Sequence, residues 1–212
     1  MAVMTGKAMK ELLPMAQSID ISLNGQTMQR GWQNWTLGVM HVDHVCDADV
    51  DPNTRKLTVS SLANGQGLYL PYAENQSPDH GMTFRTLGSY TRQVNANGNC
   101  TWVCTGPFSG CRAAVFSSGT NLIFAHLVTE SAARPENERT CTHVELQRSG
   151  VWAALPDGEK KLVDDCRIGS NEEGSKGWVF WLRSGAEWGR YTVYVNGSRR
   201  ITSVEPFVRI DV

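Results

Sequence analysis

The last third of the chain contains the pattern that most constrains its fold. Residues 177–182, 191–195 and 198–204 are rich in branched and aromatic side chains. Such side chains are typical of β-strands. Asn196-Gly197 separates the last two runs, and this dipeptide is a strong signal for a two-residue hairpin turn. The sequence therefore predicts consecutive strands here and a fold built mainly from sheets.

Further short strands are predicted along the rest of the chain, at residues 19–23, 31–45, 55–62, 68–70, 83–94, 100–104, 121–128 and 142–147. In the first of these, alternation places Ile19, Ile21 and Leu23 on one face. The segments at 55–62 and 68–70 are expected to pair as a hairpin.

Residues 6–16 predict a short amphipathic helix whose inward face carries Ala8, Leu12 and Met15, and which Pro14 ends or bends. Many short strands with few helices predict the α+β class. The architecture we expect is a β-sandwich of mixed sheets with a few peripheral helices, in a single catalytic domain over residues 1–212.

Composition excludes several classes of function. A chain of 212 residues with 41% hydrophobic and 19% charged residues fits a soluble globular protein of one ordinary domain, or at most two small ones. Its net charge of -1 gives no basic surface for nucleic acid or an anionic membrane. No segment approaches the roughly 20 apolar residues of a membrane span. Residues 1–17 lack the apolar core of a signal peptide. We expect a monomer whose six cysteines are free thiols.

Residues 105–126 hold the best candidates for chemistry. Cys111 follows the turn-forming residues 106–110, and His126 lies in a predicted strand that places it on one face with Leu122 and Phe124. A thiol is a good nucleophile as thiolate, and a neighbouring imidazole lowers the thiol pKa and accepts its proton. The alternative is a buried structural cysteine and a hydrogen-bonded core histidine.

The string Phe-Ser-Gly-Cys at 108–111 resembles the Leu-Ser-Gly-Cys signature of glutamine deamidase toxins of the cytotoxic necrotizing factor and Burkholderia lethal factor types. His126 lies fifteen positions after Cys111, as in the necrotizing-factor pattern. Thr105 lies six positions before it, as in the lethal factor and the distantly similar chemotaxis-receptor deamidases. Residues 67–72 resemble the apolar-Leu-Pro-aromatic strand end of the lethal factor. The resemblance covers roughly residues 67–130.

This resemblance implies a protein-glutamine deamidase with the same kind of α+β architecture. Cys111 would be the nucleophile, His126 the acid and base, and Thr105 the group that orients the imidazole through its hydroxyl or main-chain carbonyl. Backbone N–H groups of the turn at Ser109 and Gly110 would stabilise the oxyanion. The reaction would convert a glutamine to glutamate with release of ammonia, and it needs no metal or cofactor.

The resemblance also implies a setting for the reaction. The protein would be a bacterial virulence factor, secreted or injected, that acts in the host cytosol. Its substrate would be a host protein such as a Rho-type GTPase or an RNA-helicase translation factor. A toxin delivered by injection needs no cleavable signal peptide.

Several alternatives to a deamidase remain open at this point. A cysteine protease or a transglutaminase would use the same pair of residues. A non-enzymatic β-rich binding domain would hold Cys111 and His126 as inert core residues. Arg112 would favour the thiolate weakly if it turned inward, although a solvated position is expected.

Two groups of residues could be read as metal sites. In the stretch 41–49, strand alternation separates His41 and Asp43 from His44 and Cys46. The set of Cys100, Cys104, Cys141 and His143 does not have the spacing of a standard zinc finger. The sequence therefore predicts no metal site.

Overall fold

A computed structural model describes residues 3–23, 26–27, 44–70, 90–95, 99–108, 112–118, 121–127, 160–169 and 175–211. The predicted strand at 142–147 lies outside these residues, as does most of the predicted strand at 31–45. Among the described residues one helix, α1 (Gly6–Leu12), continues into the 3-10 turn η1 (Leu13–Met15). None of these helices is long and apolar enough to cross a membrane.

The strands are β1 (Ser18–Leu23), β2 (Gln26–Thr27), β3 (His44–Val50), β4 (Lys56–Ser61), β5 (Gly67–Leu70), β6 (Tyr90–Asn95), β7 (Trp102–Phe108), β8 (Arg112–Ser118), β9 (Asn121–Leu127), β10 (Lys160–Arg167), β11 (Lys176–Ser184), β12 (Glu187–Val195), β13 (Ile201–Val204) and β14 (Val208–Ile210). The described part of the chain is therefore mostly β.

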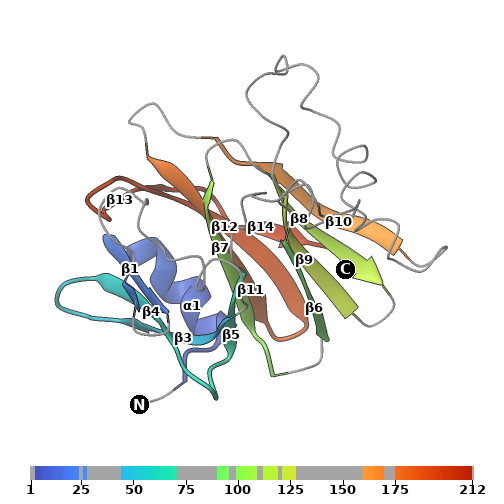
Figure 1. Cartoon of the computed structure of the whole chain (residues 1–212), viewed down its shortest axis with the longest axis horizontal. Coiled ribbons are helices and arrows are strands. Elements are labelled where there is room, and N and C mark those ends of the chain that lie inside the picture. The colour runs from blue at the N-terminus through green and yellow to red at the C-terminus, as the bar shows by residue number, and fades with distance from the viewer. Residues whose placement is uncertain are drawn as a thin grey trace, which may run out of the picture.

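The strands form two sheets, which lie side by side in Figure 1. The larger has the order β13-β12-β11-β7-β5-β3-β4-β1-β2, with β14 also paired to β12. The smaller has the order β10-β8-β9-β6. The larger sheet is mixed, since β1 runs parallel to β4 and β5 runs parallel to β7. The predicted mixed pairing is thus confirmed.

The larger sheet curls until its far strands nearly meet. Ser18 of β1 forms an isolated antiparallel bridge with Arg200, just before β13. The N–H of Ile201 donates to the carbonyl of Gln17 at 2.9 Å. The sheet is therefore almost closed around its own core.

The concave side of the larger sheet holds the first hydrophobic core, into which α1 inserts Met9 and η1 inserts Leu13. A second core fills the space between the two sheets. It combines side chains of β5, β7, β11 and β12 with side chains of β8 and β9, and it is built from Leu68, Leu70, Val103, Phe108, Ala113, Val115, Leu122, Phe124, Ile168, Val179, Trp181, Trp188 and Ile210. Strands β7 and β11 contribute to both cores, so they form the wall between them.

One charged pair crosses the second core. Asp164 of β10 accepts hydrogen bonds from the Trp181 indole at 2.9 Å and from Arg190 Nε at 3.0 Å. Arg190 also donates to Thr192 at 2.8 Å. Because Asp164 belongs to the smaller sheet and its partners belong to the larger one, this pair ties the two sheets together.

The N-terminal predictions are confirmed for β1 and wrong in part for the helix. The side chains of β1 alternate as expected, with Ile19, Ile21 and Leu23 buried. The helix ends before Pro14, as predicted. Met15, however, is 53% exposed. The turn tightens to 3-10 geometry at its end, and Leu13 takes the inward position instead.

Two hairpin predictions need correction. Strands β4 and β5 do not pair, because β3 lies between them in the sheet. Strands β12 and β13 do pair antiparallel, yet β13 begins only at Ile201. Their connection is longer than a two-residue turn because the Asn196 side chain accepts hydrogen bonds from the N–H groups of Ser198 and Arg200.

Candidate active site around His126

Strand β7 continues through residues predicted to form a loop. It runs to Phe108 and includes Gly106 and Pro107. Opposite it on β11, Thr105 pairs with Val179 and Phe108 pairs with Gly177. Two residues of β7 therefore lie opposite the single residue Trp178, which is a β-bulge. We call residues 105–108 the β7 bulge.

The bulge brings two side chains onto the same histidine. In a regular strand, residues three positions apart point to opposite faces, so Thr105 and Phe108 would diverge. The extra residue of the bulge shifts the alternation by one position, so that both side chains point to the same face. Thr105 Oγ1 lies 2.8 Å from His126 Nδ1, and the Phe108 ring stacks on the imidazole with its centroid 4.0 Å away and an interplanar angle of 16°. His126 is thus held both at one nitrogen and on one ring face.

Buried neighbours fix the bulge from the other side of β7. The Tyr69 hydroxyl donates to the Gly106 carbonyl at 2.9 Å. A Cβ at Gly106 would come within 2.6 Å of the Trp178 indole, so only glycine fits there without a shift. Tyr69 belongs to β5, whose last residue, Leu70, pairs with Thr105. The stretch at 67–70 that carries part of the resemblance therefore lies beside the bulge.

The imidazole of His126 is fully buried, and burial lowers its pKa to about 3. The ring is therefore neutral at pH 7. Thr105 is a neutral partner, so it orients the imidazole without the charge that a carboxylate would supply. If Nδ1 donates its proton to Thr105 Oγ1, Nε2 carries the lone pair and can act as a base.

The low pKa of His126 makes the protein's stability depend on pH. Its pKa in the unfolded chain is near 6.5. Between that value and about 3, the unfolded chain binds a proton that the folded protein does not, so stability falls as the pH falls. We expect this residue alone to reduce the free energy of unfolding by about 3 kcal/mol from pH 7 to pH 4.

Urea unfolding of wild type and His126→Gln at several pH values measures this effect. The variant has no imidazole at this position, so its stability should fall less over the same interval. Parallel pH dependence of the two proteins would contradict a neutral, buried His126.

The predicted nucleophile and oxyanion residues, Ser109, Gly110 and Cys111, lie outside the described residues. Ala113 of β8 pairs directly with His126. The structure thus brings Thr105 and His126 together.

Arg112 is not the solvated residue that the sequence suggested. It donates to both carboxylate oxygens of Asp165 on β10, at 3.1 and 2.7 Å. Its side chain is only 13% exposed. This bidentate pair anchors the first residue of β8, directly after Cys111.

Two of the described thiols, Cys46 and Cys166, are poor nucleophiles. Burial raises the pKa of Cys46 well above its ordinary value and that of Cys166 to about 12. Cys46, Cys100, Cys104 and Cys166 form no disulfide. Within the described ranges, no group of three or more His, Cys, Asp and Glu residues could hold a metal ion. His41, Asp43, Cys141 and His143 lie outside those ranges.

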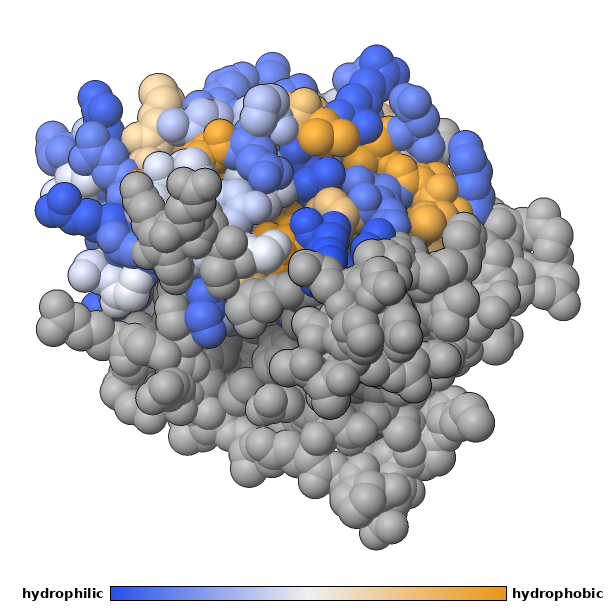
Figure 2. Space-filling view, turned by 90° about the horizontal axis from the view of Figure 1, so that it is seen from above, coloured by the Kyte–Doolittle hydropathy of each residue, from blue (hydrophilic) through white to orange (hydrophobic). Residues whose placement is uncertain are grey.

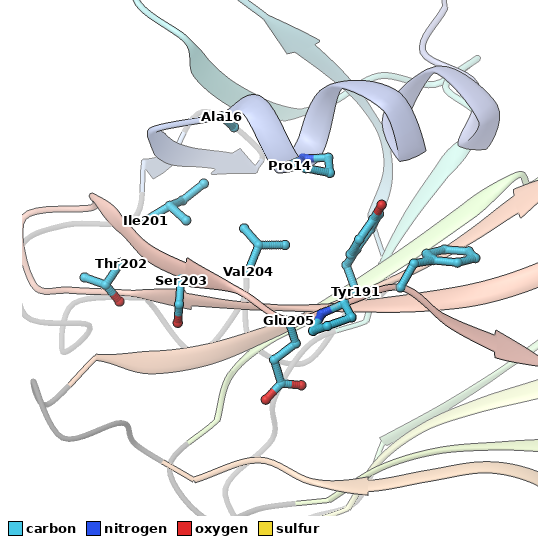
Figure 3. A pocket seen from close by; sticks show the side chains of 10 residues that line it. Pro14, Ala16, Tyr191, Ile201, Thr202, Ser203, Val204 and Glu205 are labelled. Carbon is cyan, nitrogen blue, oxygen red and sulfur yellow. The ribbon is translucent and has the colours of Figure 1, made fainter.

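A groove of about 530 Å³ lies away from these residues, between η1 and β13 (Figure 3). Pro14 and Ala16 line one side, and Val204 and Tyr191 line the other. None of Thr105, Phe108 and His126 lines it. On the face seen in Figure 2, exposed hydrophobic residues form separate patches between hydrophilic ones.

The described residues define a mostly β protein with a nearly closed mixed sheet, a second sheet, and a buried threonine–histidine pair between the two. No protein-family model and no curated protein matches the sequence.

Proposed function

We propose that this protein is a cysteine-dependent protein-glutamine deamidase in which Cys111, His126 and Thr105 act together. The observation that carries the proposal is the 2.8 Å contact between Thr105 Oγ1 and His126 Nδ1. It joins two residues twenty-one positions apart whose spacing from Cys111 resembles that of the deamidase toxins. A nucleophile, a base and a residue that orients the base are the parts of a catalytic triad.

The proposed reaction begins with transfer of the Cys111 proton to His126 Nε2. The sulfur attacks the carboxamide carbon of a glutamine side chain, and backbone N–H groups at Ser109 and Gly110 stabilise the oxyanion. His126 returns the proton to the leaving nitrogen, and ammonia departs as the thioester forms. Water, deprotonated by His126, then attacks the thioester and gives glutamate and the free thiol.

The burial of His126 shapes how this chemistry would proceed. With a pKa of about 3, the imidazole is neutral before the reaction, so thiol and imidazole form a neutral pair at rest. The imidazolium exists only after His126 has taken the proton from Cys111 and before it gives that proton to the leaving nitrogen. The face of the Phe108 ring favours a cation beside it and would stabilise that form. Such a low pKa also makes the imidazolium a strong acid toward the leaving nitrogen.

The wider setting is part of the same proposal. Under this proposal the two sheets would form a necrotizing-factor-type sandwich, and the substrate would be a host protein such as a Rho-type GTPase or a translation factor. The protein would be a toxin that reaches the host cytosol by secretion or injection. Deamidation needs no metal or other cofactor, because thiol, imidazole and backbone donors complete the chemistry.

The complete burial of His126 favours a second candidate, a non-enzymatic β-rich binding domain. In that case His126 is a core residue, and Thr105 provides the hydrogen bond that a buried polar side chain needs in the folded protein. One experiment separates the two candidates. Host-cell lysate is incubated with wild type or with Cys111→Ser, and peptides are searched by mass spectrometry for glutamine converted to glutamate. Sites converted by wild type alone support the deamidase, and identical peptide sets support the binding domain.

Thr105→Val tests how the imidazole is held. The change removes the hydroxyl and conserves the branched shape of the side chain. We expect the deamidation rate to fall about 10- to 100-fold, the scale of one hydrogen bond to a charged group. Thr105→Ser, which keeps the hydroxyl, is the matched control and should stay close to wild type. A Val variant as active as wild type would leave the main-chain carbonyl as the orienting group.

A further inference from the structure

The β7 bulge must be stabilised by contacts outside the regular ladder of the sheet, because the extra residue of a bulge is not paired in that ladder. In this bulge Gly106 and Pro107 together lie opposite one residue of β11, and Pro107 has no N–H to donate. The carbonyl of Gly106 is instead bound from the side, by the hydroxyl of Tyr69 at 2.9 Å. This bond joins residues thirty-seven positions apart and is buried.

Tyr69 is placed for this role by its own strand. In β5, it pairs with Cys104 of β7 on one side and with His44 of β3 on the other. Its side chain is 2% exposed, and burial raises the pKa of its hydroxyl well above the usual value. The hydroxyl therefore stays protonated and remains a donor throughout the physiological range. Its ring lies in the first core, whereas His126 contacts the opposite face of β7.

We propose that Tyr69 is a positioning residue for His126, which acts by holding the Gly106 carbonyl so that Thr105 and Phe108 both face the imidazole. The chain of contacts is short. Tyr69 fixes Gly106, Gly106 sets the bulge, and the bulge directs Thr105 Oγ1 to Nδ1 and the Phe108 ring to the imidazole face. The effect on the ring of His126 stands on this geometry alone. The effect on catalysis rests on the proposed deamidase function.

The test compares wild type with Tyr69→Phe, which removes the hydroxyl and keeps the aromatic ring. Its first measurement is the ¹⁵N NMR spectrum of the His126 imidazole in the full chain without substrate, which reports tautomer and hydrogen bonding at each ring nitrogen. We expect the Nδ1 and Nε2 signals to move toward those of a mixture of tautomers, because the hold of Thr105 loosens. Tyr191→Phe is the matched control, since the Tyr191 hydroxyl also donates to a main-chain carbonyl, that of Lys10, at 3.4 Å.

The second measurement is the deamidation rate. A small misplacement of a catalytic group is enough to slow a reaction, and we expect Tyr69→Phe to lower kcat about 10-fold with KM nearly unchanged. Unchanged imidazole signals in Tyr69→Phe, or equal shifts in Tyr191→Phe, would overturn the positioning role. If wild type shows no deamidation while the imidazole signals move as expected, the proposed function fails and the positioning role stands.

Thermal unfolding first establishes that Tyr69→Phe is folded at the temperature of measurement. If it is not, 4-aminophenylalanine at position 69 gives a second test, because its para-amino group keeps a donor near Gly106. Imidazole signals like those of wild type then support the proposal, and displaced signals in the folded protein contradict it.

Discussion

Cys111→Ser should abolish deamidation while the protein stays folded. Serine is nearly the size of cysteine, but its hydroxyl is too weakly acidic to lose its proton to a neutral imidazole whose pKa is about 3. We expect the rate to fall by at least about 1,000-fold, the scale seen when a nucleophile is removed from a catalytic triad. Glutamate formation in a target peptide measures the rate, and thermal unfolding measures the fold.

Cys166→Ser is the matched control for this prediction. Like Cys111, Cys166 directly precedes an arginine in the sequence, and its pKa of about 12 keeps it a thiol. Its replacement should leave the deamidation rate unchanged. Retained activity in Cys111→Ser would remove Cys111 from the mechanism. A large loss of thermal stability in that variant would assign Cys111 a structural role instead.

Asp164→Ala should cause the largest loss of stability among the substitutions considered. Asp164 and Arg190 are 6% and 8% exposed at their side chains, so the change leaves the guanidinium charge in the core between the sheets. Removal of one partner of a buried ion pair reduces the free energy of unfolding by about 3–5 kcal/mol. Loss of the acceptor for the Trp181 indole acts in the same direction.

The neighbouring residue supplies the comparison. Asp165→Ala breaks the pair with Arg112, whose two side chains are 13% and 21% exposed. Water can reach those groups more easily, so we expect a loss of at most about 2 kcal/mol. Urea unfolding of the two variants and wild type gives both values. Equal losses would show that the Asp164–Arg190 pair contributes no more than its more exposed neighbour.

Local patterns in the sequence were sufficient for some of the strands whose side chains alternate or are mostly apolar, although the apolar strand β8 was not predicted. β1, β9 and β11 lie within a residue or two of their predicted positions. β10 was not predicted, because its Asp164 faces the core. A buried carboxylate looks like a surface residue until its partner is known, and Arg190 comes twenty-six positions later.

The pairing of strands was harder to predict than their positions. A turn signal between residues 62 and 67 shows only that the chain reverses. It does not show that β3, from earlier in the chain, lies between β4 and β5. Pairing of strands distant in sequence is decided by packing of the whole sheet, which local propensity does not contain.

The candidate site was also predicted only in part. Spacing from Cys111 indicated that Thr105 and His126 belong together, and their side chains are in contact. The role of Phe108 was missed, because Gly106-Pro107 is typical of a turn and a turn would end the strand before it. Proline is tolerated inside a sheet at a bulge, since the missing N–H there interrupts no ladder bond. The signal that could have revealed the bulge is the Gly-Pro pair inside an otherwise apolar run.

The near closure of the larger sheet has a consequence for how the protein can be made. Strand β1 begins at Ser18, and its first residues are bonded by residues 199–201, so the start of this strand cannot be paired until a segment near residue 200 has been made. Loop-closure entropy must be overcome before contacts so distant in sequence can form. A nascent chain therefore cannot complete this sheet while residues 199–201 are still in the ribosome. The first core, which contains Met9 and Leu13 of the N-terminal segment, is closed only after residues 199–201 have been synthesised.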